Sequence, residues 1–227
     1  MNKTVIRTGL WSSALCLASF IIWIISFTGI AVTSPVFYWT NLNDYIEYVS
    51  GYSQFFQYLA KSFMIVFSMA YVVLILVYYE FSSIQKQIFA KISVAFTIMF
   101  ALLSGSHYFI QISAIRFAIT ENQFSGLEHF IQANPISVIL SVNMFGWTIL
   151  SGLSSLFMFL ALQPDILIKT IRTGLLINTI SCFSGTTGYL FQIDIITFIF
   201  MNLGVGAAFL MITISSIRFF YKKSQSN

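Results

Sequence analysis

The sequence predicts an all-α membrane protein, a single-domain bundle of six transmembrane helices. Of its 227 residues, 58% are hydrophobic and only 8% are charged, whereas soluble domains carry roughly 25% charged residues. The apolar runs reach about 20 residues without the alternation of β-strands, which is the length that a helix needs to cross the hydrocarbon core. Because lipid cannot satisfy backbone hydrogen bonds, such runs are predicted to be helices.

Six apolar segments define the predicted spans. They cover residues 10–32, 62–79, 92–118, 135–162, 173–192 and 195–219. The first follows Lys3 and Arg7 and could be taken for a signal peptide, but its core is long and a proline follows the best cleavage motif, so we expect a retained helix. The fifth contains NTISCFSGTTGY, and we expect this polar run to face other helices.

The basic residues predict the orientation of the chain. Membrane proteins keep Lys and Arg mainly on the cytoplasmic side. Of the 11 basic residues, only Lys61 and Arg116 fall on the predicted outer side. Both termini are therefore predicted to lie in the cytoplasm, with the chain in the cell membrane. The short basic loops also account for the net charge of +4 without a nucleic-acid partner.

Two longer segments, 43–60 and 121–133, are predicted at the external surface. Aromatic and apolar residues recur in the first at steps of three or four: Tyr45, Tyr48, Tyr52, Phe55 and Leu59. Such a helix suits the headgroup region of a bilayer, and as an alternative it forms a lid or a docking surface. In the second we expect a short helix, with Asn134 before Pro135 as the N-cap of the fourth span.

Polar residues inside the predicted spans give the main functional signal. With the predicted orientation, one set falls at a common depth in the outer half of the membrane: His107, Tyr108, Gln111, Asn143, Thr187 and Asn202. Polar groups at this depth are costly and commonly mark ligand or proton pathways. Hydrogen bonds between helices would explain them equally well. A ligand-binding site and interhelical contacts therefore both stay open as interpretations.

The charged residues at the outer interface have a structural interpretation. Arg116 can extend to the lipid headgroups, or it can pair with an outer carboxylate. Asp194, which lies just beyond the fifth predicted span, is the partner we expect, with Glu121 and Glu128 as alternatives.

The chain lacks the residue sets that common membrane enzymes need. His107 is the only histidine in a predicted span, which excludes bis-histidine haem ligation, and no three or four ligands cluster for zinc. No nucleotide-binding loop is present. Cys16 and Cys182 both fall in predicted spans and are expected to be packing residues. We therefore expect no metal, no cofactor and no assignable catalytic residue.

One stretch of the sequence resembles a group of uncharacterised bacterial six-helix membrane proteins. The resemblance rests on Tyr108, Phe109, Gln111 and Arg116, then on Gly126, Leu127, Gln132, Asn134 and Pro135, and finally on Gly146, Trp147 and Ser151. Relatives often carry acidic residues just before the glycine-aromatic pair, where this chain has Asn143 and Met144. The resemblance implies the six-helix architecture and no particular activity.

Three classes of function fit these observations. The preferred one is the binding or carriage of a small apolar or amphiphilic molecule, such as a lipid, whose head the outer polar residues would orient. The alternative is an accessory or sensory subunit of a membrane complex, in which the external aromatic helix contacts a protein partner. The third is a lipid-modifying enzyme with His107 as general base, which is the weakest because no second titratable group is near it in the sequence.

Overall fold

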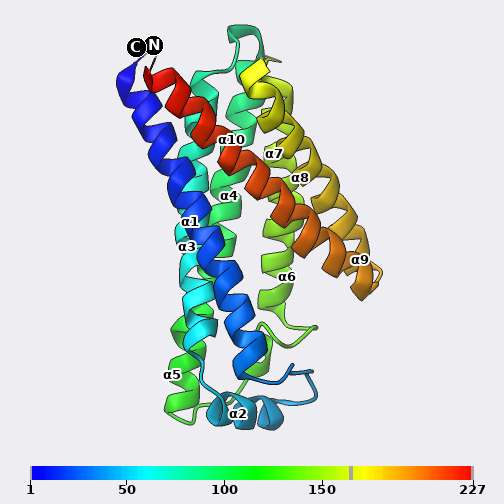
Figure 1. Cartoon of the computed structure of the whole chain (residues 1–227). Helices are drawn as coiled ribbons and strands as arrows, with labels where there is room; N and C mark the ends of the chain where they lie inside the picture. The colour runs from blue at the N-terminus through cyan, green and yellow to red at the C-terminus, as the bar shows by residue number, and fades with distance from the viewer. Residues whose placement is uncertain (1, 164–165, 226–227) are drawn as a thin grey trace.

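The computed structural model describes residues 2–163 and 166–225, and within these ranges the secondary structure is entirely helical. Its long helices are α1 (Lys3–Thr33), α3 (Phe55–Glu80), α4 (Gln87–Ile112), α8 (Ile166–Leu190) and α10 (Val205–Gln225). They form one elongated bundle (Figure 1). The all-α class predicted from the sequence is confirmed.

Shorter helical segments extend or join the long helices. The 3-10 helix η1 (Ile84–Lys86) precedes α4, and α5 (Ala114–Thr120) follows it. In the last helix, α9 (Asp194–Phe198) and the π-helical η4 (Ile199–Gly204) lead directly into α10. Another continuous helix consists of α6 (Val138–Met144), the π-helical η3 (Phe145–Leu150) and α7 (Ser151–Ala161). The remaining elements are α2 (Leu42–Gly51) and the 3-10 helix η2 (Leu127–His129).

Five helical segments of the described chain are long and apolar enough to cross a membrane. They are Lys3–Thr33, Phe55–Glu80, Ile84–Thr120, Val138–Ala161 and Asp194–Gln225. Large hydrophobic side chains such as Trp11, Met69 and Leu102 are exposed on their outer faces, as expected of a surface in contact with lipid. These features fit an integral membrane protein. The polar helix α8 is less apolar than the other five.

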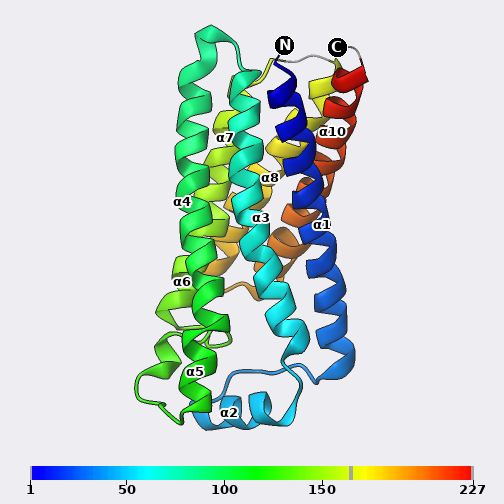
Figure 2. The same cartoon turned by 90° about the vertical axis from the view of Figure 1, so that its left-hand side faces the viewer.

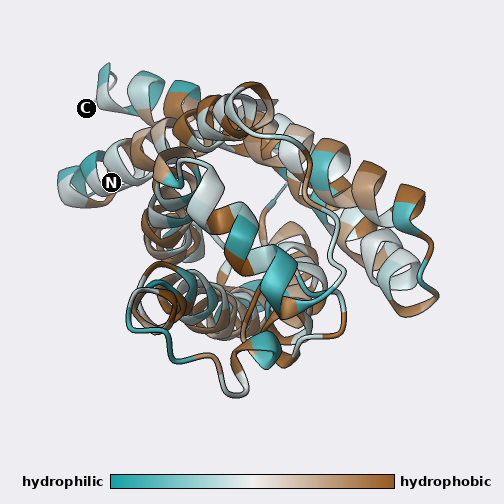
Figure 3. Cartoon of the chain, turned by 90° about the horizontal axis from the view of Figure 1, so that it is seen from below, coloured by the Kyte–Doolittle hydropathy of each residue, from teal (hydrophilic) through white to brown (hydrophobic). Residues whose placement is uncertain are grey.

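The helices close into a ring in which each packs against two neighbours. The contacts run from α1 to α3, α4, α7, α8 and α10, and back from α10 to α1; Figure 2 shows α4, α3 and α1 side by side. The first turn of α1 and the last turn of α10 lie at one end, called here the terminal end, and α2 lies across the opposite end, called the α2 end (Figure 1). Viewed from the α2 end, α2 carries both hydrophilic and hydrophobic residues (Figure 3).

Aromatic side chains fill the centre of the ring. The Phe67 and Tyr71 rings meet the edge of Phe209 at centroid distances of 4.9 and 5.2 Å, and Phe100 meets Trp147 at 4.8 Å. Edge-to-face pairs of this kind are favourable beyond the area they bury. The aromatic core therefore forms a solid layer across the middle of the bundle.

A buried polar cluster ties α4, α7 and α8 together. The Asn178 amide donates to the hydroxyls of Ser155 and Ser151 at 2.8 and 3.2 Å. The Ser93 hydroxyl donates to the Ser154 carbonyl at 2.7 Å. These side chains connect neighbouring helices and act as interhelical contacts.

The segments at the α2 end differ from their predicted form. The aromatic segment is two helices, because α2 ends at Gly51 and α3 already begins at Phe55. Asn134 is not the N-cap of the next helix. Ser137 is, since its hydroxyl accepts from the Leu140 N–H at 3.2 Å. Asn134 instead closes a turn, in which its side-chain oxygen accepts from the Ile136 N–H at 3.1 Å. The turn residue and the cap are three positions apart, and the sequence pattern alone did not separate them.

Candidate functional site

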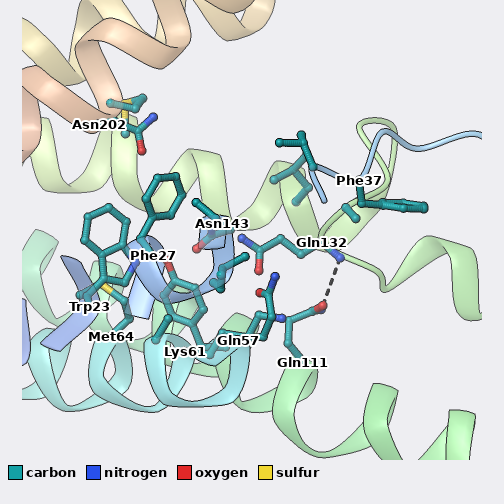
Figure 4. A pocket seen from close by; sticks show the side chains of 18 of the residues that line it. Trp23, Phe27, Phe37, Gln57, Lys61, Met64, Gln111, Gln132, Asn143 and Asn202 are labelled. Carbon is teal, nitrogen blue, oxygen red and sulfur yellow. Dashed lines mark hydrogen bonds between the residues drawn. The ribbon is translucent and has the colours of Figure 1, made fainter. Parts of the chain in front are cut away.

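A cavity of about 600 Å³ lies in the half of the bundle nearer the α2 end (Figure 4). Its walls come from α1, α3, α6 and η4, with further residues from α4 and from the loop before α6. The helices α1 and α10 touch near the terminal end, where Gly9 faces the Phe220 ring, and they diverge towards the α2 end (Figure 1). Because they diverge, space is left between them below the aromatic core.

One end of the cavity is apolar and aromatic. Phe20, Trp23, Met64, Trp147 and Met201 line it. The Trp23 ring stacks on Phe20 at a centroid distance of 5.5 Å and on the next lining residue along α1, Phe27, at 5.7 Å. These flat rings and flexible thioethers form a surface that suits a hydrocarbon chain.

The other end of the cavity is polar. Its lining includes Gln57, Lys61, Gln111, Gln132 and Asn143 (Figure 4). Gln111 fixes the loop before α6: its amide donates to the Phe130 carbonyl at 2.6 Å, and its side-chain oxygen accepts from the Gln132 N–H at 3.1 Å. The polar end therefore has a rigid wall made by α4 and this loop.

Three buried polar atoms on residues that line the cavity have no hydrogen-bond partner in the described part of the chain. They are the side-chain oxygens of Asn143, a residue 5% exposed, and of the half-buried Gln132, and the indole N–H of Trp147, 9% exposed. The Asn143 and Trp147 side chains both lie beside the Tyr108 hydroxyl, but the indole N–H does not have hydrogen-bond geometry with that hydroxyl. Buried polar groups are normally paired. These residues therefore leave hydrogen-bonding capacity unused beside the cavity.

Both π-helical segments of the described chain border the cavity. Trp147 comes from η3, and Met201 and Asn202 come from η4. A π-helical turn replaces the regular hydrogen-bond pattern of an α-helix and is frequently found at functional sites. It also changes the direction in which side chains point. Here the two segments bring an aromatic, a thioether and an amide side chain to the lining of the same cavity.

The cavity collects four of the six predicted site residues, Tyr108, Gln111, Asn143 and Asn202. The structure does not place His107 there. That ring is fully buried, with its Nδ1 3.2 Å from the Ile139 carbonyl, and its Nε2 faces the side chain of Gln132. The cavity lies on the side of α4 that Tyr108 and Gln111 share, and His107 points into the contact with α6.

Thr187, the sixth predicted site residue, also lies outside the cavity. Its hydroxyl donates to the Phe183 carbonyl of its own helix at 3.1 Å, and its side chain is exposed. The prediction for Thr187 rested only on its depth in the membrane. Its helix, α8, packs on α7 and α10, on the far side of the ring from the α1 and α3 walls of the cavity.

The expected ion pair between Arg116 and Asp194 is not formed. The Arg116 guanidinium carbon lies over the rings of Tyr58 and Phe117, 5.9 and 5.6 Å from their centroids. Asp194 is exposed in the first turn of α9. The two helices α5 and α9 stand at opposite sides of the bundle (Figure 1), which is the physical reason that the side chains do not meet.

Sequence analysis missed Gln57, Lys61 and Gln132 as site residues. Lys61 counted only as an external charge, because it precedes the predicted start of the second span. A signal was present, since Gln57, Lys61 and Met64 are spaced four and three residues apart and share one helical face. The structure extends α3 back to Phe55, so that this face forms part of the cavity wall.

The polar side chains of the cavity are suited to holding a ligand by hydrogen bonds. Among the described residues that line the cavity, the polar side chains are amides, tyrosines, a serine, a threonine and one lysine, without a carboxylate or a histidine. At its rim, burial and then the neighbouring Tyr58 and Tyr48 hydroxyls raise the pKa of Tyr45 to about 12. This tyrosine therefore stays a neutral hydrogen-bonding group at physiological pH.

No protein-family model, curated protein or solved structure matches this chain. The resemblance to bacterial six-helix membrane proteins stays a prediction. Function has to be inferred from the cavity itself.

Proposed function

We propose that the protein binds or carries a small amphiphilic molecule in the outer half of the cell membrane. The observation that carries this proposal is the cavity itself, which joins an aromatic end at Trp23 and Met64 to a polar end at Gln132 and Asn143. Ligand sites typically combine an apolar lining with a few polar groups that fix orientation. The apolar end suits the body of an amphiphile and the polar end suits its head.

The proposal includes a six-span topology with both termini in the cytoplasm. Its support is that α8 has 25 residues, close to the 26 of α3 and of α4, and packs between α7 and α10. The first and last helices also begin and end at the same end of the bundle (Figure 1), as an even number of crossings requires. The basic residues near the terminal end make this end cytoplasmic, and the cavity then lies in the outer half.

The contrast between two polar clusters favours a site over interhelical contacts. In the cluster around Asn178, the amide donates to two serines of a neighbouring helix, although its side-chain oxygen is unpaired. In the outer cluster, the Asn143 oxygen and the Trp147 N–H are unpaired, and both residues line the cavity. Interhelical hydrogen bonds explain the first arrangement, whereas the second leaves polar groups without such bonds beside a cavity.

The alternative functions receive less support. An accessory subunit would present the aromatic face of α2 to a partner, but Tyr48 of that face packs on Phe37 at a ring distance of 4.9 Å, and Tyr45 and Tyr48 line the cavity. A lipid-modifying enzyme would need His107 at the ligand, and this ring is buried against the Ile139 carbonyl.

Native mass spectrometry of the protein, extracted gently from its own membrane, tests the proposal. We expect a retained small molecule or lipid in the wild type. Ala31→Trp adds bulk to an exposed position that lines the cavity and should abolish retention, whereas Ile21→Trp, at an exposed position of the same helix outside the cavity, should leave it unchanged. A bare protein in all three samples, or equal retention in both variants, would refute the proposal.

A further inference from the structure

We infer that the ligand carries an acidic head group, a carboxylate or a phosphate, and that Lys61 binds it. This inference rests on the proposed function and adds the chemical class of the ligand. A fatty acid and an acidic membrane lipid share this chemistry, an anionic head on a hydrocarbon tail. Lys61, half-buried in the second turn of α3, is the only cationic residue that lines the cavity in the described part of the chain.

The charge of Lys61 has no acidic partner inside the described protein. In the described part of the chain, the ion pair with a nitrogen–oxygen distance of 4.0 Å or less is the one between His129 and Glu128. No Asp or Glu is among the described residues that line the cavity. A cation inside a membrane protein is costly unless it pairs or reaches water, and such residues commonly mark ligand sites. An anionic head group would supply the missing counter-charge.

The neighbours of Lys61 suit an anion as well. Gln57 lies one helical turn before it on the same face of α3, and Gln132 and Asn143 face it from the opposite wall (Figure 4). Each of these side chains carries an amide NH2 group that can donate to an oxygen. The head-group end of the cavity therefore offers one positive charge and several neutral donors, and it would repel a cationic amphiphile.

The order of residues along α3 sets the direction of the ligand. Gln57 and Lys61 are followed, one turn nearer the centre of the bundle, by Met64, which lines the cavity beside Phe20 and Trp147. A head group at Lys61 would therefore place the tail against the aromatic end. This is the direction of a lipid in the outer leaflet, whose head is at the surface and whose tail points inwards.

Quenching of the cavity tryptophans by brominated probes tests the inference. A bromine atom on a hydrocarbon chain quenches an indole that it contacts, and Trp23 and Trp147 both line the cavity. The other two tryptophans are removed in a Trp11→Phe, Trp39→Phe background. In phosphatidylcholine nanodiscs, this protein is titrated with a mid-chain-brominated fatty acid and with its uncharged methyl ester. A second series uses nanodiscs that contain chain-brominated phosphatidylglycerol or chain-brominated phosphatidylcholine.

The expected result is saturable quenching by an acidic probe at lower concentration than by its uncharged or zwitterionic counterpart. Lys61→Gln should weaken binding of the acidic probe about tenfold or more, the usual effect of losing a charge-assisted hydrogen bond, and leave the methyl ester unchanged. Lys61→Arg should retain binding. Lys91→Gln, which removes a lysine outside the cavity, is the matched control.

The outcomes separate this inference from the proposed function. If only the fatty acid shows the Lys61 dependence, the ligand is a free acid, and if only phosphatidylglycerol shows it, the ligand is a membrane lipid. Equal quenching by acid and ester in every variant would overturn the acidic head group and leave amphiphile binding intact. Absence of saturable quenching by every probe would overturn both.

Discussion

Replacing Asn143 by leucine separates a ligand site from an interhelical contact. The side-chain oxygen of Asn143 is buried and has no hydrogen-bond partner, and an unpaired buried polar group costs about 1–3 kcal/mol. Leucine removes this cost and keeps a similar volume, although it also loses the interaction with Tyr108. We therefore expect Asn143→Leu to raise the free energy of unfolding by about 1 kcal/mol.

Asn178→Leu is the matched control because it changes an equally buried asparagine in the same way. Its NH2 group forms two interhelical hydrogen bonds, each worth about 0.6 kcal/mol in a membrane protein, while its side-chain oxygen is also unpaired. Fitting leucine into a closely packed site costs about 1–3 kcal/mol more. These two losses together exceed the gain from removing the unpaired oxygen, so we expect a net loss of about 1 kcal/mol. For a chain of this length, 1 kcal/mol shifts the melting temperature by roughly 2–4 °C.

Thermal unfolding of both variants in one detergent, at one scan rate, measures the difference. Asn143→Leu should melt roughly 2–4 °C above the wild type, and Asn178→Leu roughly 2–4 °C below it. The stabilised variant should also lose its bound amphiphile in native mass spectrometry. If Asn143→Leu lowers the melting temperature as much as Asn178→Leu does, then Asn143 is an interhelical contact, and the assignment of the polar end as a binding surface is wrong.

Two further predictions concern the wall of the cavity and the outer interface. Gln111→Ala removes both hydrogen bonds to the loop before α6 and should lower the free energy of unfolding by about 2 kcal/mol, with faster amide exchange at Gln132; unchanged exchange there would show that Gln111 does not fix the loop. In a double-mutant cycle of Arg116→Ala and Asp194→Ala, we expect a coupling energy within about 0.3–0.5 kcal/mol of zero, as for distant independent sites. A coupling of 1 kcal/mol or more, roughly that of a good ion pair, would contradict the structure.

The sequence was sufficient for the fold class and for part of the polar lining of the cavity. The length of the apolar runs predicted the helices. The orientation of each span then predicted how deep each of its polar residues lies in the membrane. Depth alone grouped Tyr108, Gln111, Asn143 and Asn202, which the structure brings to one cavity. It could not exclude Thr187, because depth does not say which helices are neighbours in the ring.

The remaining differences come from helix phase and helix length. Regular helical spacing places His107 with Gln111, but the actual cavity faces the Tyr108 side of α4. The π-helical η3 and η4 change the phase of Trp147 and Asn202 relative to a regular helix, and no sequence pattern reports such a segment reliably. Lys61 was missed because hydropathy placed the start of the second span after it, whereas the helix itself starts at Phe55.

Two close helix contacts explain the cavity. One holds α1 on α10 near the terminal end, and the other holds α9 on α8, away from α1. Near the terminal end, Gly9 leaves room for the Phe220 ring, so that α1 and α10 can approach. Close to the turn between α8 and α9, a Cβ atom on Gly188 would lie 2.7 Å from the backbone nitrogen of Thr197, so only glycine lets α9 pack this closely on α8. The segment that leads into α10 is thereby held on α8 and away from α1. The same two glycine contacts that close the ring of helices therefore leave space between α1 and η4 in the half nearer the α2 end, where the aromatic and amide side chains of the site line the cavity.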